Sequence, residues 1–404
     1  MGADVRPAAE AAGRAPLRVL LAPDKFKGTL TAAQVCAAVA AGVAEAADRA
    51  GVPVVVTTVP VADGGDGTLV AAVASGFEAV PARATGPDGA PRAAAWARRG
   101  DEAVVELAAV SGLALLPRDG LRPLTSTSRG TGELVRAALD AGCRRVVLGI
   151  GGSASTDGGA GLVSALGARV LGPDGAPVAD GGAALQDAVR LDLSGRHPAL
   201  AEADLVVACD VDRPLTGPTG AAAVFGPQKG AGAADVAVLD AALGHWADLV
   251  ADATGGPDHR DDPGAGAAGG VGFGAVAVLG ARLAPGAPLL LALTGLDAAL
   301  APLGPDDLVV TGEGSLDAQT LHGKAPAGVA AAARAHGVPV VAVCGRLALD
   351  RAGLDEAGLA AAYALTDLTR DEATLYGDPE PLLTELGRRL LRDHLGRRPY
   401  GDLS

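Results

Sequence analysis

The sequence is poor in aromatic residues and in lysine, and it contains no asparagine at all. Phenylalanine, tryptophan and tyrosine make up 2% of the 404 residues, so alanine, valine and leucine must fill the core. Only four of the 33 basic residues are lysine, namely Lys25, Lys27, Lys229 and Lys324. Since nearly all basic residues of this chain are arginine, a surface cation without a special role would also be arginine. Each lysine therefore marks a position with a specific requirement.

Positive charge is scarce overall, and the formal net charge is −14. Binding to nucleic acid or to an anionic membrane surface needs clustered positive charge, so we expect neither as a partner. The four cysteines show no CxxC pair and no metal-finger spacing, which predicts reduced thiols in the core of a cytoplasmic protein.

No apolar run is long enough to suggest a membrane span. The longest, residues 287–300, is short and contains Asp297. Residues 1–16 lack the apolar core of a signal peptide and predict a disordered leader. We therefore expect a soluble, cytoplasmic protein, and the sequence leaves open whether it is a monomer or a homodimer.

Apolar runs alternate with helical patterns at both ends of the chain. Runs at 17–23 and 52–60 flank an alanine-rich helix over 31–50, with Thr31 as its N-cap. The same pattern returns as strands expected at 307–312, 338–345 and 361–367 and helices expected at 325–336 and 379–394. Buried strands separated by helices are typical of a parallel sheet covered on both faces.

The middle of the chain has a different pattern of apolar and turn residues. Short runs within 77–107 surround a Gly-Pro-Asp-Gly turn, which predicts an antiparallel hairpin. Strands and helices alternate again from 132 to 251, and the Gly, Pro and Asp content of 254–270 predicts a flexible surface loop.

We therefore predict an α/β protein with two domains. Residues 17–80 and 300–404 form a parallel α/β domain, and residues 81–299 form an inserted mixed α/β domain. A cleft between the two is the expected ligand site.

Two segments near the start of the chain place charged residues directly after expected strands. In PDKFKG (23–28), Lys25 and Lys27 are expected to reach a site, because ligands bind beyond the carboxyl ends of parallel strands. In PVADGGDGTL (60–69), Asp63 and Asp66 flank a glycine pair that a ligand can approach closely, and the following helix offers free N–H groups. A solvated loop is the alternative for the lysines, and an N-cap is the alternative for Asp66.

A loop rich in glycine and hydroxyl groups follows the strand expected at 144–150. GIGGSASTDGG (149–159) predicts an anion cradle that includes Gly151, Gly152, Ser153, Thr156 and Asp157. Its likeness to a dinucleotide fingerprint is superficial, because no acidic strand end follows about 20 positions later. Residues 125–134 have a similar composition and could complete the cradle.

Two further segments combine carboxylates with the remaining lysines. In residues 208–231, Asp210 lies at a strand end, where a carboxylate can hold Mg²⁺ or accept a hydroxyl proton, and Lys229 comes near the end of the segment. Residues 309–330 contain Glu313, Asp317 and Lys324, but not at the spacing of a Walker A motif. Compact lysine charges, carboxylates and glycine-rich loops together suit phosphoryl transfer.

These five segments, in this order, resemble the bacterial glycerate kinases of the type that includes the tartronate-semialdehyde pathway enzymes. PDKFKGTLTA, ADGGDGT, GIGGSASTDGG, CDVDRPLTGPTGAAAVFGPQKGA and TGEGSLDAQTLHGKAP are similar to that family's hallmark stretches, and the resemblance runs from about residue 17 to about residue 395. It implies phosphorylation of D-glycerate by ATP with Mg²⁺ and 2-phosphoglycerate as the product. It also implies a flavodoxin-like domain formed by both chain ends and an inserted, restriction-enzyme-like domain.

The resemblance leads to a hypothesis for each candidate residue. Glycerate would bind between the domains, with its carboxylate on Lys27; Lys25 is less secure, because the family often has serine there. Lys229 or Lys324 would neutralise the transferred phosphoryl group, and the loop 151–156 would cradle the nucleotide phosphates. The candidates for the base are Asp210 first and Asp63 second, and the candidates for Mg²⁺ ligands are Asp317 and Glu313.

Several alternatives stay open at this point. The residues themselves do not choose between 2-phosphoglycerate and 3-phosphoglycerate as product, or between glycerate and another small hydroxy acid. A nicotinamide-dependent dehydrogenase built on the 149–154 loop and a non-catalytic sensor of an acidic metabolite are the alternatives from other classes.

Overall fold

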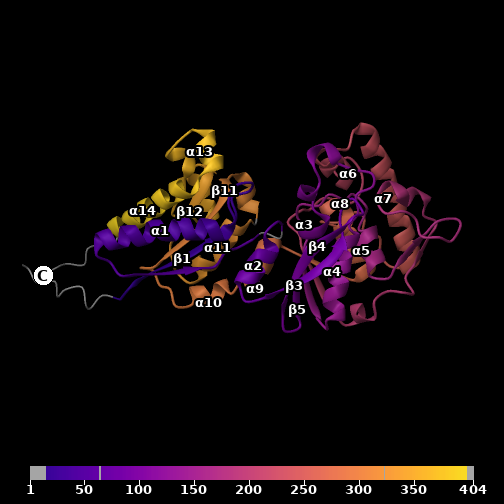
Figure 1. The fold of residues 1–404 in the computed structure, drawn as a ribbon, viewed down its shortest axis with the longest axis horizontal. Coiled ribbons are helices and arrows are strands. Elements are labelled where there is room, and N and C mark those ends of the chain that lie inside the picture. The colour runs from indigo at the N-terminus through magenta and orange to yellow at the C-terminus, as the bar shows by residue number, and fades with distance from the viewer. Residues whose placement is uncertain (1–14, 63–64, 323, 398–404) are drawn as a thin grey trace, which may run out of the picture. The chain divides into compact units, whose positions relative to one another are not determined.

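The computed structural model describes residues 15–62, 65–322 and 324–397, which form two compact units. Unit 1 consists of the described residues up to 62 and from 291 onward, and unit 2 of those from 65 to 290. Unit 1 is thus built from both ends of the chain, and unit 2 is inserted into it (Figure 1). Most of the predicted leader, residues 1–14, lies outside the described residues.

The boundaries of these units differ from the predicted ones at 80/81 and 299/300. Helix α2 (Thr68–Ala74) belongs to unit 2, because it packs on that unit's strands β4 (Pro91–Arg99) and β5 (Glu102–Glu106). Helix α10 (Leu296–Leu300) belongs to unit 1, where it packs on β1 (Leu17–Pro23). Sequence patterns locate such elements but do not show which sheet they cover.

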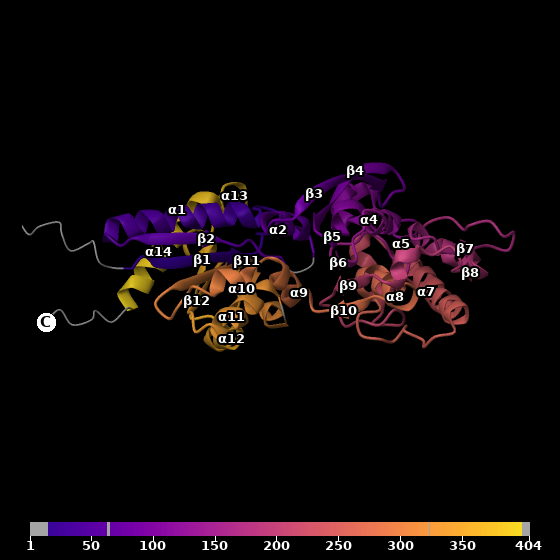
Figure 2. The same ribbon diagram turned by 90° about the horizontal axis from the view of Figure 1, so that it is seen from below.

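Unit 1 is a five-stranded parallel sheet with helices on both faces (Figure 2). The strand order is β13-β12-β11-β1-β2, with every neighbouring pair parallel. The strands other than β1 are β2 (Val54–Thr58), β11 (Leu308–Leu316), β12 (Val340–Leu347) and β13 (Ala361–Ala364). This is the flavodoxin-like order, so the predicted class of this unit is confirmed.

Successive side chains of β1 alternate between the two faces of that sheet. Leu17, Val19 and Leu21 join one core cluster with α1 (Ala32–Ala50) and α14 (Glu380–Arg397). Leu20 and Ala22 join the other with α10, α11 (Ala325–Ala335) and α12 (Arg351–Ala357).

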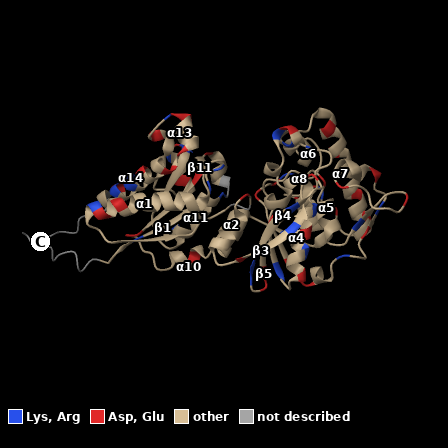
Figure 3. Cartoon of the chain, viewed as in Figure 1, with Lys and Arg blue, Asp and Glu red and all other residues tan. Residues whose placement is uncertain are grey.

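Thr31 caps α1 as predicted and forms a capping box with Gln34. Charges of both signs cover α14, where Arg388 pairs with Glu45 and Glu385 (Figure 3).

Unit 2 contains a six-stranded mixed sheet in the order β10-β9-β6-β5-β4-β3. Strand β3 (Glu78–Thr85) pairs antiparallel with β4, and β4 with β5, which confirms the predicted hairpin. The remaining pairs are parallel and add β6 (Arg145–Gly149), β9 (Asp204–Ala208) and β10 (Arg282–Ala284). A small antiparallel pair lies apart, formed by β7 (Arg169–Leu171) and β8 (Arg190–Asp192).

The helices of unit 2, apart from α2, contribute to one core cluster that contains Trp246 and Phe273, two of its largest buried side chains. They are α2, α3 (Ala108–Ser111), α4 (Arg129–Asp140), α5 (Ala160–Ala165), α6 (Ala221–Phe225), α7 (Ala233–Thr254) and α8 (Ala267–Leu279). Helix α9 (Gly286–Leu293) contains the second unit boundary, and α13 (Glu372–Gly377) belongs to unit 1.

The prediction of a flexible surface loop over 254–270 is wrong for its second half. Residues 255–263 are mostly exposed, but Gly264–Ala267 and Gly269–Gly270 are buried, and α8 begins at Ala267. Small residues are also what a tightly packed backbone needs, and composition alone does not separate that use from a loop.

Three of the four cysteines lie in the core clusters, as predicted. All four cysteines are free; Cys36, Cys143 and Cys344 are buried and Cys209 is half-buried. Within the described part of the chain, no helix is both long and apolar enough to cross a membrane.

Candidate functional site

The carboxyl ends of three parallel strands meet at one edge of the unit 2 sheet. Gly149 at the end of β6 lies opposite Glu106 of β5 and Ala208 of β9. The loop 150–159 and Asp210 therefore leave the sheet at the same edge, which is where open α/β sheets bind ligands.

Backbone hydrogen bonds hold the loop after β6 against the segment after β5. Leu107 N donates to Gly149 O at 2.9 Å, Leu113 N donates to Gly152 O at 2.8 Å, and Ala154 N donates to Ser111 O at 3.0 Å. Gly151, Gly152 and Ser153 are thus held in place by a second chain segment rather than by their own turn.

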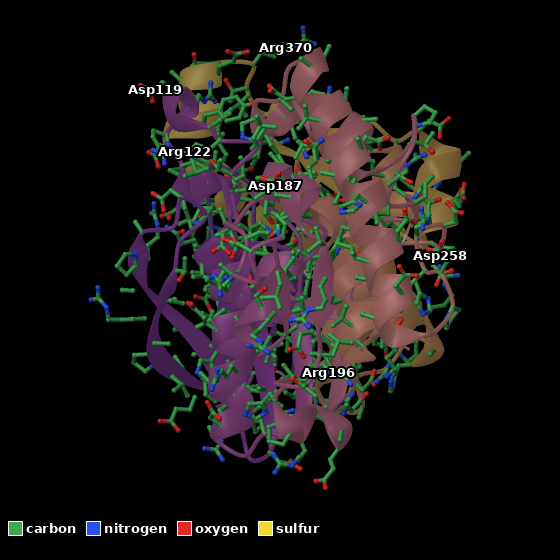
Figure 4. All side chains as sticks on the ribbon, turned by 90° about the vertical axis from the view of Figure 1, so that its right-hand side faces the viewer. Asp119, Arg122, Asp187, Arg196, Asp258 and Arg370 are labelled. Atoms are coloured by element: carbon green, nitrogen blue, oxygen red, sulfur yellow. The ribbon has the colours of Figure 1, made fainter. Side chains whose placement is uncertain are left out.

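Lys229 lies inside this loop. It is 2% exposed, and it is the only buried lysine or arginine among the described residues. Other charged side chains of unit 2, such as Asp187 and Asp258, project from the surface (Figure 4). The Lys229 Nζ donates to Ser153 Oγ at 2.9 Å and to the carbonyl oxygen of Ser155 at 2.5 Å.

The ammonium group of Lys229 has no carboxylate bonded to it among the described residues. Burial lowers its pKa from the ordinary value of 10.5 to about 7, and the charge of Asp157 opposes the shift. A buried cation that bonds only neutral oxygens is well suited to receive an anion.

Three buried hydroxyl groups in this unit lack a partner. Among the described residues, no hydrogen-bond partner reaches Ser126 Oγ, Ser155 Oγ or Thr156 Oγ1. Buried hydroxyls are normally paired, so these are donors available to a ligand. Two of them belong to the predicted anion cradle, and Ser126 belongs to the segment 125–134 that was expected to complete it.

Asp157 has a different role from the other members of the loop. Its buried carboxylate accepts hydrogen bonds from Ser128 N at 2.9 Å, Ser128 Oγ at 2.8 Å, Gly159 N at 3.2 Å and Gly161 N at 3.3 Å. Burial raises its pKa, and these hydrogen bonds oppose the rise. A carboxylate so occupied ties the start of α4 to the start of α5, and it would repel a phosphate rather than bind it.

Asp210 is exposed at the same sheet edge. Its Oδ1 accepts a hydrogen bond from Gly286 N at 2.8 Å, which orients the carboxylate. A solvent-accessible carboxylate at a strand end can accept a proton from a bound hydroxyl group.

Glu106 was missed from the sequence. It is buried at the end of β5 and accepts hydrogen bonds from Gly67 N at 3.2 Å and Leu69 N at 2.7 Å. The N–H groups of α2 that were expected to face a ligand are thus taken by Glu106. The N-cap is Gly67 rather than Asp66, which is exposed. An acidic residue ending the apolar run 103–105 was the available signal.

Asp63 and Gly64 lie outside the described residues, so the predicted role of Asp63 has no structural description here.

In unit 1, the strand order reverses between β1 and β11, and this switch point is the expected ligand site of a flavodoxin-like sheet. The loop after β1 touches β11 there: Asp24 N donates to Gly312 O at 2.8 Å, and a Cβ on Gly314 would lie 3.4 Å from Lys27 N. Lys27 is exposed, whereas Lys25 is half-buried with its Nζ 3.8 Å from Asp24 Oδ1.

Glu313, Thr320 and Lys324 form a connected group at the same edge. The Glu313 carboxylate accepts hydrogen bonds from Thr320 Oγ1 at 2.6 Å and from Lys324 Nζ at 3.2 Å. Burial raises the pKa of Glu313, and both partners oppose the rise. Asp317 is half-buried and accepts from Gln319 N at 3.0 Å and Ser315 Oγ at 3.2 Å.

The described residues contain no group of three or more His, Cys, Asp and Glu side chains that could hold a metal ion by themselves. Mg²⁺ usually takes only one or two carboxylates and completes its shell with phosphate and water oxygens. Asp317 fits that use better than Glu313, because its carboxylate accepts from two neutral groups, Gln319 N and Ser315 Oγ, whereas that of Glu313 is paired with the Lys324 ammonium.

The structure therefore gathers the candidate residues into two sets. In unit 2, Lys229, Asp157 and Asp210 accompany the loop that contains Gly151, Gly152, Ser153 and Thr156. Unit 1 contains Lys25, Lys27, Glu313, Asp317 and Lys324. Apart from Glu313, which lies within β11, these residues follow the carboxyl ends of parallel strands.

Comparisons with known proteins agree with the resemblance of the five segments. The model of the glycerate kinase family matches residues 19–395. The glycerate kinase of Bacillus subtilis (strain 168) is 44% identical over 352 residues, which cover 86% of this chain and 90% of that protein. The glycerate 2-kinase of Escherichia coli (strain K12) is 41% identical over 362 residues, 88% of this chain and 93% of that protein. A crystal structure described as glycerate kinase 2 from Salmonella typhimurium LT2 is similar with a TM-score of 0.80 at 38% identity, covering 95% of this chain and 99% of that one.

Proposed function

The chain belongs to the glycerate kinase family and is an ATP-dependent kinase of glycerate, and on that premise we propose that it phosphorylates the 2-hydroxyl group of D-glycerate with Mg²⁺ as cofactor. The dehydrogenase and sensor alternatives receive no support from the comparisons. The 2-hydroxyl is favoured because one of the named relatives is a glycerate 2-kinase.

The observation that carries this proposal is the buried Lys229 inside a loop with unpaired hydroxyl groups. Its Nζ bonds only Ser153 Oγ and the Ser155 carbonyl, while Ser155 Oγ and Thr156 Oγ1 have no partner among the described residues. An ammonium and two hydroxyl donors match the oxygens of a phosphate group. We assign the nucleotide phosphates to this loop, with Lys229 neutralising the transferred phosphoryl group.

Asp210 is the proposed base. The substrate hydroxyl oxygen forms a bond to the γ-phosphorus, the bond from that phosphorus to ADP breaks, and the hydroxyl proton goes to the Asp210 carboxylate. Its hydrogen bond from Gly286 N orients the carboxylate at the sheet edge. Asp63 stays the second candidate for this role.

The residues of unit 1 are assigned to the substrate carboxylate and to the metal. Lys27, exposed at the switch point between β1 and β11, would pair with the carboxylate of glycerate. Asp317, with Glu313 as the alternative, would hold Mg²⁺, which when bound neutralises phosphate charge. Lys324 stays with Glu313 as its ion-pair partner. That the substrates bind between the domains stays a prediction.

The test is incubation of the protein with ATP, Mg²⁺ and D-glycerate, followed by phosphorus NMR of the product. We expect 2-phosphoglycerate, and no product when Mg²⁺ is removed with a chelator. A 3-phosphoglycerate signal would refute the proposed position, and turnover of another hydroxy acid at a higher kcat/KM would refute the proposed substrate. The Lys229→Met variant is expected to be inactive, and full activity of that variant would contradict the proposed phosphate site.

We place this reaction in the cytoplasm, because all four cysteines are free and three of them are buried.

A further inference from the structure

The backbone is left-handed over three consecutive residues at the start of α8. The φ and ψ angles are 53° and 36° at Ala268, 71° and 30° at Gly269, and 91° and 7° at Gly270. Ala268 is the only residue other than glycine with a positive φ in the described part of the chain. An alanine in this region costs roughly 1–2 kcal/mol, so the surrounding structure must hold the turn in place.

This turn lies directly on the loop that contains the phosphate-binding candidates. A Cβ on Gly269 would be 2.1 Å from the carbonyl oxygen of Ser155 and 2.7 Å from Thr156 Cα. A Cβ on Gly270 would be 2.6 Å from Gly158 Cα. Gly158 N donates a hydrogen bond to Gly269 O at 2.9 Å. The two backbones are thus in contact at a distance that no side chain allows.

The contact continues to the buried lysine. The Ser155 carbonyl that faces Gly269 is the same group that accepts a hydrogen bond from Lys229 Nζ at 2.5 Å. The position of this carbonyl therefore sets one of the two bonds that orient the ammonium, and the left-handed turn limits where the carbonyl can go.

We propose that the left-handed turn Ala268–Gly270 is a positioning element for phosphoryl transfer, which holds the Ser155 carbonyl in place so that it orients Lys229 toward the phosphate. This inference rests on the proposed role of Lys229 and extends it to a segment without any side chain that could touch a substrate. It gives a reason for the strained backbone of Ala268 at the start of α8, where an ordinary helix start would need no residue with a positive φ.

The experiment compares two glycines of α8 that share the same backbone conformation. Gly269 and Gly280 both have a φ of 71°, with ψ of 30° and 22°. A Cβ at Gly280 meets nothing within 4 Å, whereas a Cβ at Gly269 meets the Ser155 carbonyl. Gly280→Ala thus introduces the backbone strain alone, and Gly269→Ala introduces the same strain together with the displacement of Ser155.

We expect Gly280→Ala to lower the melting temperature slightly and to leave kcat/KM and its pH profile unchanged. Gly269→Ala is expected to lower kcat/KM for ATP by about 10- to 100-fold, the usual effect of a displacement of about 1 Å at a catalytic group. Because Lys229 loses an acceptor for its charged form, the alkaline limb of the pH profile of kcat/KM should also move to lower pH. A merely structural glycine would not move that limb.

A second measurement on the unaltered protein applies even if Gly269→Ala does not fold. Hydrogen exchange is followed with and without the probe ADP plus Mg²⁺. We expect the amides of 268–272 to become protected together with those of 153–158; protection of the loop without any change in the turn would overturn the inference. So would a Gly269→Ala variant that matches Gly280→Ala in kcat/KM and pH profile. An active Lys229→Met variant would instead refute the proposed role of Lys229, and the absence of 2-phosphoglycerate as product with the unaltered protein would refute the proposed function itself.

Discussion

Replacement of Lys229 by methionine should make the protein inactive and yet more stable near neutral pH. Methionine has nearly the shape of the lysine stem but no charge, so it removes the cost of the buried ammonium. Burial lowers the Lys229 pKa from 10.5 to about 7. At about 1.4 kcal/mol for each pKa unit, this shift means that the charged form of Lys229 is destabilised by on the order of 5 kcal/mol in the folded protein.

The sign of the pH dependence follows from proton binding. Between pH 7 and pH 10.5 the unfolded chain binds a proton at Lys229 that the folded protein does not, so the stability of the unaltered protein rises with pH across this window. The cost of the lysine is complete below pH 7 and disappears toward pH 10.5. The stabilising effect of Lys229→Met should therefore be largest at pH 6 to 7 and about 3 kcal/mol smaller at pH 9.5.

The assay is urea unfolding of both proteins at several pH values, with kcat/KM measured on the same samples. The two hydrogen bonds that methionine loses, to Ser153 and Ser155, add a nearly constant destabilisation of about 1–3 kcal/mol, which does not affect the pH-dependent difference. Lys27→Met is the matched control, because that lysine is exposed and its loss should leave the pH dependence of stability unchanged. If Lys229→Met and the unaltered protein respond equally to pH, the lysine is not desolvated as described and the reasoning fails.

Three other predictions concern the remaining candidates. Asp157→Asn should destabilise unit 2 by about 3 kcal/mol, because an amide nitrogen would face backbone N–H donors that now bond a carboxylate. A melting temperature within 1 °C of the unaltered protein would contradict the view that Asp157 ties the start of α4 to the start of α5. Asp210→Asn should lower the single-turnover rate about 10²- to 10⁴-fold with little change in nucleotide affinity, since its amide oxygen still accepts from Gly286 N; an undiminished rate would remove Asp210 from the mechanism. Lys27→Ser should raise the KM for glycerate about tenfold or more, and Lys25→Ser should raise it much less; equal effects would show that the exposed lysine is not the one that meets the substrate carboxylate.

The candidate site shows where sequence reasoning succeeded. The loop 149–159 was assigned to an anion because of its glycines and hydroxyls, and Lys229 because lysine is rare in this chain. Both are parts of one local arrangement, with the lysine bonded to Ser153 and Ser155. The rarity of lysine thus pointed to a residue that the fold places inside the predicted loop, and the binding of a phosphate there stays a prediction.

The two features that were missed or misread from the sequence have a common cause. Glu106 caps the start of α2 by accepting from Gly67 N, which lies 39 positions away in the sequence. The segment 264–270 looked like a loop because glycine and alanine serve equally well in a loop and in a tight backbone contact. In both cases the meaning of the residue depends on a neighbour that is distant in the chain.

The sequence by itself determined the alternation of strands and helices at both chain ends, the hairpin in unit 2, the N-cap at Thr31 and the family. These features depend on apolar periodicity, turn residues and short motifs, which are local and can be read in order. Tertiary structure alone decided which strand ends meet, that Lys229 is buried, and that a left-handed turn lies against Ser155. Those properties arise from contacts such as Lys229 to Ser153, 76 positions apart, and from the removal of water around them, which no local pattern encodes.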